Sequence, residues 1–242
     1  MIGIDQWLGA VVDLSHTLSP GFPGHPSSRS PQVSTVTDFT DNVCFQLRWD
    51  LDEHSGTHLD APAHFAAGEL TVDALPAADL VLNAAVLDVR RRAQDDADAL
   101  VEVADIVGWE HRHGPLPQPC AVLALTGWSD RSADRRAYHG LDEAEVPHWP
   151  GFAPAAADFL VRERPQATAL GVDTPSLDSA RNERAGCPVH RTWLHERRFG
   201  LEHLTNLAAL PEAGAAVVVG VPKLAGGSGG PARVLAFVRE DM

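Results

Sequence analysis

The sequence from residue 54 to residue 64 reads His54-Ser55-Gly56-Thr57-His58-Leu59-Asp60-Ala61-Pro62-Ala63-His64. It places three imidazoles and a carboxylate close together in a chain with only 12 histidines. Imidazole nitrogens and carboxylate oxygens are the ligands that a divalent ion of borderline softness selects. A single histidine here would more often be structural, but a chance cluster of four such groups is a poor explanation because each must be solvated or paired. The stretch therefore predicts a metal site.

The local sequence favours a strand that runs into a loop. A Ser-Gly pair and the following Pro62 disfavour a helix. In an extended backbone, the even spacing of His54, His58 and Asp60 points all three side chains to one face. His64 joins that face only if the loop stays extended.

The length and composition predict one packed α/β domain over residues 1–242. The hydrophobic content is 44%, and no long linker or internal repeat divides the chain. Strand-like runs occupy residues 10–14, 33–37, 43–51, 84–89, 121–125, 167–172, 215–221 and 234–238, and a Gly-rich stretch at 226–231 resembles a hairpin connection. Helical patterns occupy residues 75–82, 101–111 and 153–164, and residues 189–206 read as a helix followed by a loop or a second helix. Because strands outnumber helices and alternate with them irregularly, we expect a mixed sheet rather than a doubly wound fold.

The charge excludes several classes of partner. A formal net charge of −14 argues against nucleic acid and against anionic membrane surfaces, since both need clustered Lys and Arg. Residues 1–7 lack a basic region followed by an apolar one, and no apolar run approaches membrane-spanning length. We therefore expect a cytoplasmic protein with a small-molecule substrate.

The pattern His-x-Gly-Thr-His-x-Asp-x-Pro-x-His at residues 54–64 resembles the signature of the cyclase family of metal-dependent hydrolases, which includes bacterial kynurenine formamidase and isatin hydrolase. Further similar stretches lie at residues 13–15, 22–24, 126–128, 171–178 and 222–226. The resemblance implies the swivelling β/β/α fold of this family, with a mixed sheet.

The second half of the site rests on the resemblance. From the residues alone, Asp173, Asp178, His190 and Glu202 are all open candidates, and solvated surface charge is the usual fate of such groups. The resemblance assigns His54, His58 and Asp60 to one ion, and Asp60, His190 and Glu202 to a second ion. His195, Glu196 and His203 are close competitors. We expect Zn²⁺, as one or two ions, with Mn²⁺ as the alternative.

This ligand set predicts hydrolysis. A bound divalent ion lowers the pKa of water toward neutrality and polarises a carbonyl oxygen. His64 is not needed as a ligand, and an imidazole with an ordinary pKa near 6.5 suits a proton shuttle to the leaving amine. The first hypothesis is hydrolysis of N-formyl-L-kynurenine to kynurenine and formate. The alternatives are opening of a cyclic amide such as isatin or of a lactone, and a metal-binding protein without turnover.

Two further expectations concern the substrate and the assembly. Phe22 is predicted to stack on a planar ring of the substrate, with a core position as the alternative. At residues 22–25 this chain reads Phe-Pro-Gly-His, whereas the corresponding stretch of kynurenine formamidases resembles Trp-Pro-Gly followed by an acidic residue. The departures at Phe22 and His25 leave the identity of the substrate open. The resemblance also implies a homodimer or homotetramer in which the segment around Phe22 helps to close a site. Trp149 and Phe152, which look exposed among prolines, support an oligomer only weakly.

Overall fold

Apolar and β-branched runs form the strands of the computed structural model, which describes residues 9–40 and 42–238. The strands are β1 (Ala10–Asp13), β2 (Gln32–Thr37), β3 (Gln46–Asp50), β4 (His58–Asp60), β5 (Val81–Asp88), β6 (Leu100–Val101), β7 (Cys120–Leu125), β8 (Gly151–Phe152), β9 (Ala167–Val172), β10 (Phe199–Glu202), β11 (Ala213–Gly220), β12 (Gly229–Pro231) and β13 (Arg233–Val238). The helices are α1 (Arg90–Asp95), α2 (Val103–His113), α3 (Arg135–Tyr138), α4 (Pro154–Glu163), α5 (Ala180–Arg184) and α6 (Pro188–Trp193).

Nine of these strands form one mixed sheet in the order β1-β13-β11-β5-β7-β9-β10-β4-β12. The central strands β5, β7, β9 and β10 are parallel, and the strands on both sides of them are antiparallel. Every residue of β7 is buried, as expected for a parallel strand covered on both faces. The mixed α/β architecture predicted from the sequence is confirmed.

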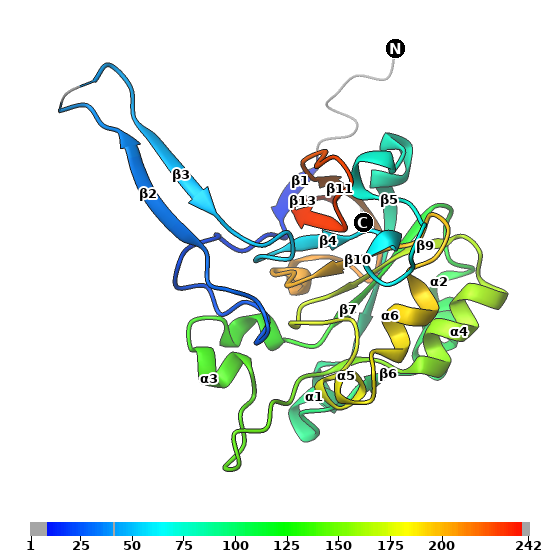
Figure 1. Ribbon diagram of the computed structural model, residues 1–242. Coiled ribbons are helices and arrows are strands. Elements are labelled where there is room, and N and C mark those ends of the chain that lie inside the picture. Colours follow the sequence, from blue (N-terminus) through cyan, green and yellow to red (C-terminus); the bar gives the residue numbers. More distant parts are fainter. Residues whose placement is uncertain (1–8, 41, 239–242) are drawn as a thin grey trace.

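The two faces of the sheet have separate cores. Along β7, Leu123 packs into the core that also contains Leu59 and Leu201, while Val122 points to the opposite core beneath Trp109. This alternation follows from the two-residue period of a strand. Helices α2, α4 and α6 cover the second face (Figure 1), and their residues Trp109, Leu160 and Trp193 are part of its core.

All eight predicted strands are present, although the one expected at 43–51 begins later, at Gln46. Two helix predictions are wrong. Residues 75–82 contain only a 3-10 turn at Ala77–Leu80, since β5 begins at Val81 to pair with β11. Residues 189–206 begin with a helix but continue into strand β10, because pairing with both β9 and β4 overrides the local preference.

The Gly-rich stretch does connect the antiparallel strands β11 and β13, and in addition it forms the edge strand β12 against β4. None of the described helices is long and apolar enough to cross a membrane. The expectation drawn from residues 1–7 lies outside the described residues.

A hairpin made of β2 and β3 extends away from the body of the protein (Figure 1). Within the described residues, these two strands form a sheet of their own. Trp149 and Phe152 lie instead in the interior, with exposed fractions of 1% and 0%, because Trp149 donates a hydrogen bond to the Asp178 carbonyl and Phe152 packs under the helices. The expectation that these two aromatics are exposed is wrong.

Candidate metal centre

Strand pairing brings the first acidic and basic groups of the site together. In the antiparallel register of β4 and β10, Glu202 lies opposite His58 and Gly200 lies opposite Asp60. A Cβ atom on Gly200 would stand 3.3 Å from Asp60 Oδ2, so the glycine leaves room for the carboxylate. His58 Nε2 lies 3.2 Å from Asp60 Oδ1 and 3.4 Å from Glu202 Oε2.

A turn, rather than a continuous strand, places the His54 side chain beside Asp60. Gly56 adopts a left-handed conformation with φ of 63°, which folds the chain back before β4 begins at His58. As a result, His54 Nδ1 lies 2.6 Å from Asp60 Oδ1. The structure does bring His54, His58 and Asp60 together, but the even-spacing argument applies only to the last two.

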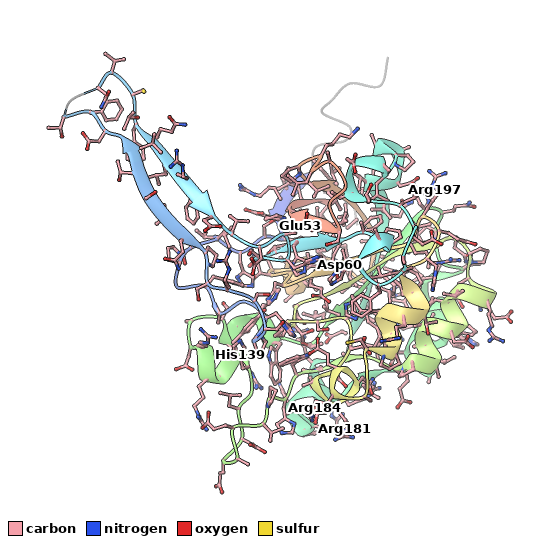
Figure 2. The ribbon with its side chains drawn as sticks, in the orientation of Figure 1. Glu53, Asp60, His139, Arg181, Arg184 and Arg197 are labelled. Atoms are coloured by element: carbon pink, nitrogen blue, oxygen red, sulfur yellow. The ribbon has the colours of Figure 1, made fainter. Side chains whose placement is uncertain are left out.

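Helix α6 contributes the third imidazole from the opposite side. His190 Nε2 lies 2.9 Å from Glu202 Oε1 and 3.5 Å from Asp60 Oδ2. The His54, His58 and Asp60 set and the Asp60, His190 and Glu202 set each place one candidate ligand atom per residue within 4.8 Å of the others. Asp60, the last residue of β4, belongs to both sets and lies inside the protein (Figure 2).

The charges of this cluster fit a divalent cation. Burial alone would lower the pKa of His58, but the carboxylates of Asp60 and Glu202 outweigh it and raise that pKa to about 10. Burial is likewise outweighed at His190, whose pKa rises well above its ordinary value beside Asp178, Asp60 and Glu202. The second oxygen of Asp60, Oδ2, is buried without a hydrogen-bond partner. Two buried carboxylates thus demand positive charge, and a cation of suitable size would meet the same demand.

Hydrogen bonds at the outer nitrogens fix how two of the imidazoles face the cluster. His58 Nδ1 donates to the Gly56 carbonyl at 2.8 Å. His190 Nδ1 donates to Asp178 Oδ2 at 2.7 Å, and the same carboxylate accepts the backbone N–H groups of Val189 and His190. In both rings Nε2 is therefore the nitrogen directed at the site, the arrangement common for metal-binding histidines.

His54 is oriented the other way round, by residues near the end of the chain. Its Nε2 lies 2.9 Å from Ser228 Oγ, and that hydroxyl donates to Glu53 Oε2 at 2.6 Å. Because the hydroxyl proton is committed to Glu53, His54 donates at Nε2 and turns Nδ1 toward Asp60. Gly229 permits this contact, since a Cβ there would stand 2.7 Å from the His54 ring. Sequence reasoning missed Ser228 and Glu53, because nothing local connects residues 175 positions apart.

The cluster forms one wall of a cavity of about 580 Å³. His64 lines this cavity and stacks on His54 with ring centroids 3.8 Å apart, and it belongs to neither candidate ligand set. It sits on a 3-10 turn, Pro62–His64, so it reaches the site without the extended loop that parity would require. Burial lowers its pKa. Phe65 also lines the cavity and stacks on His190, with ring centroids 4.6 Å apart.

The competing residues lie elsewhere. The side chains of His195 and Glu196 are 49% and 78% exposed on the surface. His203 is fully buried, and its Nδ1 bonds to the Tyr138 hydroxyl at 2.8 Å rather than to the cluster.

The structure also places Phe22 and His25, the two residues that the sequence comparison with formamidases singled out. Phe22 is only 8% exposed, packs edge-on against Tyr138 and His203, and is not among the residues that line this cavity. Its contact with a substrate remains a prediction. His25 lines the cavity, and its Nε2 lies 3.0 Å from Glu183 Oε2.

The fold and the cluster define a class of protein in which buried candidate metal ligands line a cavity within a mixed α/β domain. The sequence model of the Cyclase family matches residues 12–179, and the chain belongs to this family. The resemblance stated from the sequence is thereby confirmed.

Similar proteins agree with this assignment. An isatin hydrolase of Roseibium aggregatum is 30% identical over 94% of this chain and 91% of its own length. A kynurenine formamidase of Salinibacter ruber is 26% identical over 93% of this chain and 96% of its own. The structure of isatin hydrolase A from Ralstonia solanacearum superposes with a TM-score of 0.87 at 34% identity, covering 95% of this chain and 92% of that one. The chain is thus a metal-dependent hydrolase with the cyclase fold.

Proposed function

We propose that this protein hydrolyses an amide attached to an aromatic ring, and that a cyclic amide of the isatin type is its substrate. The observation that carries the proposal is the buried cluster of three imidazoles and two carboxylates in the wall of the cavity. The similarity to isatin hydrolases supports the cyclic substrate. In the reaction, water adds to the ring carbonyl carbon, the ring C–N bond breaks, and the single ring-opened product carries both the new carboxylate and the free aryl amine.

The proposed ligands of one ion are His54, His58 and Asp60, and those of a second ion are Asp60, His190 and Glu202. Their nitrogen and oxygen donors suit Zn²⁺, with Mn²⁺ as the alternative. When bound, such a cation polarises a carbonyl and makes water a stronger acid. The chain's own contribution is to hold these donors rigidly through Asp178, Gly56 and the Ser228–Glu53 pair.

His64 is the proposed proton shuttle. Its ring is held beside the site by stacking on His54, yet it is not needed by either ligand set. One of its ring nitrogens would take the proton released by the attacking water and return it to the leaving amine nitrogen. Phe65 offers an aromatic surface beside His190 on which the planar ring of the substrate would stack.

N-formyl-L-kynurenine is the second candidate substrate. It is supported by charged groups on the cavity wall, where His25 and Arg184 would face a carboxylate while Glu183 and Asp52 would face an ammonium group. An amino-acid tail carries both charges and isatin carries neither. These four residues would therefore contact N-formyl-L-kynurenine through its charged tail, but they would have no charged group to bind on isatin.

The test is a turnover assay of the purified protein, loaded with Zn²⁺ or Mn²⁺, on isatin, N-formyl-L-kynurenine and a simple lactone. We expect the highest kcat/KM on isatin, with product carrying one free carboxylate and one free aryl amine. A higher kcat/KM on N-formyl-L-kynurenine would replace the substrate while keeping the enzyme class. Metal binding without turnover on any of the three would favour a non-catalytic metal-binding protein.

We also propose that the chain forms a homodimer or homotetramer. The aromatics first considered as support, Trp149 and Phe152, are buried. The support instead comes from the hairpin of β2 and β3, which extends from the body and carries exposed apolar side chains.

A further inference from the structure

An ion pair lies in the cavity wall outside the two candidate ligand sets. His25 belongs to the connection between β1 and β2, Glu183 belongs to α5, and both line the cavity. His25 Nε2 lies 3.0 Å from Glu183 Oε2 and 3.2 Å from Oε1. The Ser27 backbone N–H donates to His25 Nδ1 at 3.2 Å, so the ring proton sits on Nε2 and is donated to the carboxylate. The pair thus joins two segments that are 158 positions apart in the chain.

The carboxylate of Glu183 has capacity to accept further hydrogen bonds. Within the described residues its side-chain oxygens bond to His25 alone, whereas a carboxylate has about four acceptor positions. The side chain is 20% exposed, so a ligand can reach it. Asp52, the other carboxylate of the wall outside the ligand sets, already accepts the Arg29 backbone N–H at 3.0 Å and lies 3.6 Å from the Arg29 guanidinium. Glu183 is therefore the better placed of the two to accept a hydrogen bond from a ligand.

The turn between α5 and α6 keeps Glu183 near the candidate ligands. Cys187 adopts a left-handed conformation with φ of 55°, and its Sγ lies 3.9 Å from the Glu183 carbonyl. His190 is the third residue of α6, less than one helical turn beyond Cys187. Burial lowers the pKa of His25, the Glu183 carboxylate outweighs it, and the charges of candidate ligands on β4 and β10 contribute as well. The ion pair and the ligand cluster therefore act on the same part of the cavity.

A lactam carries its N–H next to the carbonyl carbon that water attacks. A substrate whose carbonyl lies at the ligand cluster therefore has this N–H in the same part of the cavity. A hydrogen bond to a charged group strengthens binding by roughly 10- to 150-fold. A lactone or an N-alkyl lactam has no donor at this atom, and a carboxylate facing it would lose its solvation without gaining a partner.

We propose that Glu183, held in place by His25, is a specificity-determining residue that accepts the amide N–H of the substrate. This inference rests on the proposed function and narrows its substrate class to lactams with a free N–H. His25 is a positioning residue, since it acts through Glu183. Because the N–H is present in the bound substrate as well as in the transition state, its loss should raise KM and leave kcat little changed.

The test compares isatin with N-methylisatin on the metal-loaded wild type, Glu183→Ala and Glu212→Ala. We expect the wild type to favour isatin at least tenfold in kcat/KM, mainly through KM, and Glu183→Ala to show a ratio near one. Glu212→Ala is the matched control. Glu212 also pairs with a histidine, with Oε2 2.8 Å from His113 Nε2, but it is not among the residues that line the cavity. This variant should keep the wild-type ratio.

A second variant tests the role of His25. His25→Phe keeps an aromatic ring beside Trp149, which the imidazole contacts edge-on at a centroid distance of 5.8 Å, but it removes the donor to Glu183. We expect the preference for isatin to fall, because the carboxylate loses the partner that fixes it. An unchanged preference in a folded His25→Phe protein would refute the positioning role.

Binding separates this inference from the hydrolytic proposal. Oxindole has the lactam N–H of isatin and lacks the ketone that activates the ring carbonyl, so its Kd and that of N-methyloxindole can be measured on the metal-loaded protein. Tenfold tighter binding of oxindole, without hydrolysis of isatin, would leave the N–H site standing while the proposed function fails. If the wild type hydrolyses isatin and N-methylisatin equally well, or if Glu183→Ala slows both equally, the inference is overturned and the hydrolytic proposal stands.

Discussion

Asp178 fixes the orientation of the His190 ring. Its replacement, compared with that of a matched buried carboxylate, therefore separates an effect on metal affinity from an effect on folding stability. Its carboxylate is 0% exposed and accepts three hydrogen bonds, from Val189 N at 3.0 Å, His190 N at 3.1 Å and His190 Nδ1 at 2.7 Å. In Asp178→Asn one oxygen becomes an NH₂ group, which is a donor. Whichever way the amide turns, at least one buried backbone N–H then faces another donor.

Two effects are expected from Asp178→Asn. An unsatisfied buried N–H costs roughly 1–3 kcal/mol of folding free energy. Loss of the bond that fixes the His190 ring should weaken metal affinity by about 10- to 100-fold, the usual effect of losing such an outer partner. The first is measured by chemical unfolding of the metal-free protein, and the second by competition with a chromophoric chelator.

Asp98→Asn is the matched control. Asp98 is also a buried carboxylate bonded to a histidine, with Oδ2 2.7 Å from His148 Nδ1, but that histidine belongs to neither candidate ligand set. We expect this variant to lose stability and to keep its metal affinity. A folded Asp178→Asn protein that binds metal as tightly as the wild type would refute the role given to Asp178.

Three other variants test separate parts of the account. His64→Asn should keep its metal and lose roughly 100- to 10,000-fold in kcat, as general acid–base groups do; loss of metal would make His64 a ligand, and unchanged kcat would make it structural. Burial raises the pKa of Asp173 to about 6, so the native state holds this proton to higher pH than the unfolded chain does and stability falls as pH rises from about 4 to 6. Asp173→Asn should remove that fall, about 2–3 kcal/mol, from unfolding curves recorded across this range, and an unchanged pH profile would contradict the argument. Gly229→Ala should weaken metal retention measured after dialysis, because the new Cβ would stand 2.3 Å from the Leu59 carbonyl and 2.7 Å from the His54 ring; full retention would show that the edge strand can shift freely.

The long strands could be predicted from the sequence because buried strands appear in it as continuous runs of apolar residues. β7 and β9 are continuous apolar runs, and each is covered on both faces in the structure. The strand expected within residues 54–64 is present as the short β4, whereas β10 was not predicted, because polar site residues such as Glu202 mask its apolar pattern. Their strand character comes from pairing with each other, which is a tertiary effect.

The candidate ligands could be proposed from the motif and the family resemblance, but the groups that orient them could not. Ser228 and Glu53 meet only because β12 lies beside β4. Phe65 was overlooked because a single aromatic after His64 has no distinctive pattern, and its stacking on His190 depends on where α6 ends up. The even spacing along the chain also gave the wrong reason for the position of His54, which depends on the left-handed turn at Gly56 and not on an extended strand.

The central claim is that hydrolysis depends on cations held by the two ligand sets that share Asp60. The most direct measurement is a titration of chelator-stripped protein with Zn²⁺ and with Mn²⁺, in which bound metal and isatin turnover are followed together for the wild type and His58→Ala. The wild type should bind one or two equivalents of metal, with turnover rising from near zero as the sites fill, while His58→Ala should neither retain metal nor turn over. Full turnover by the stripped wild type, or full metal retention by His58→Ala, would contradict the account.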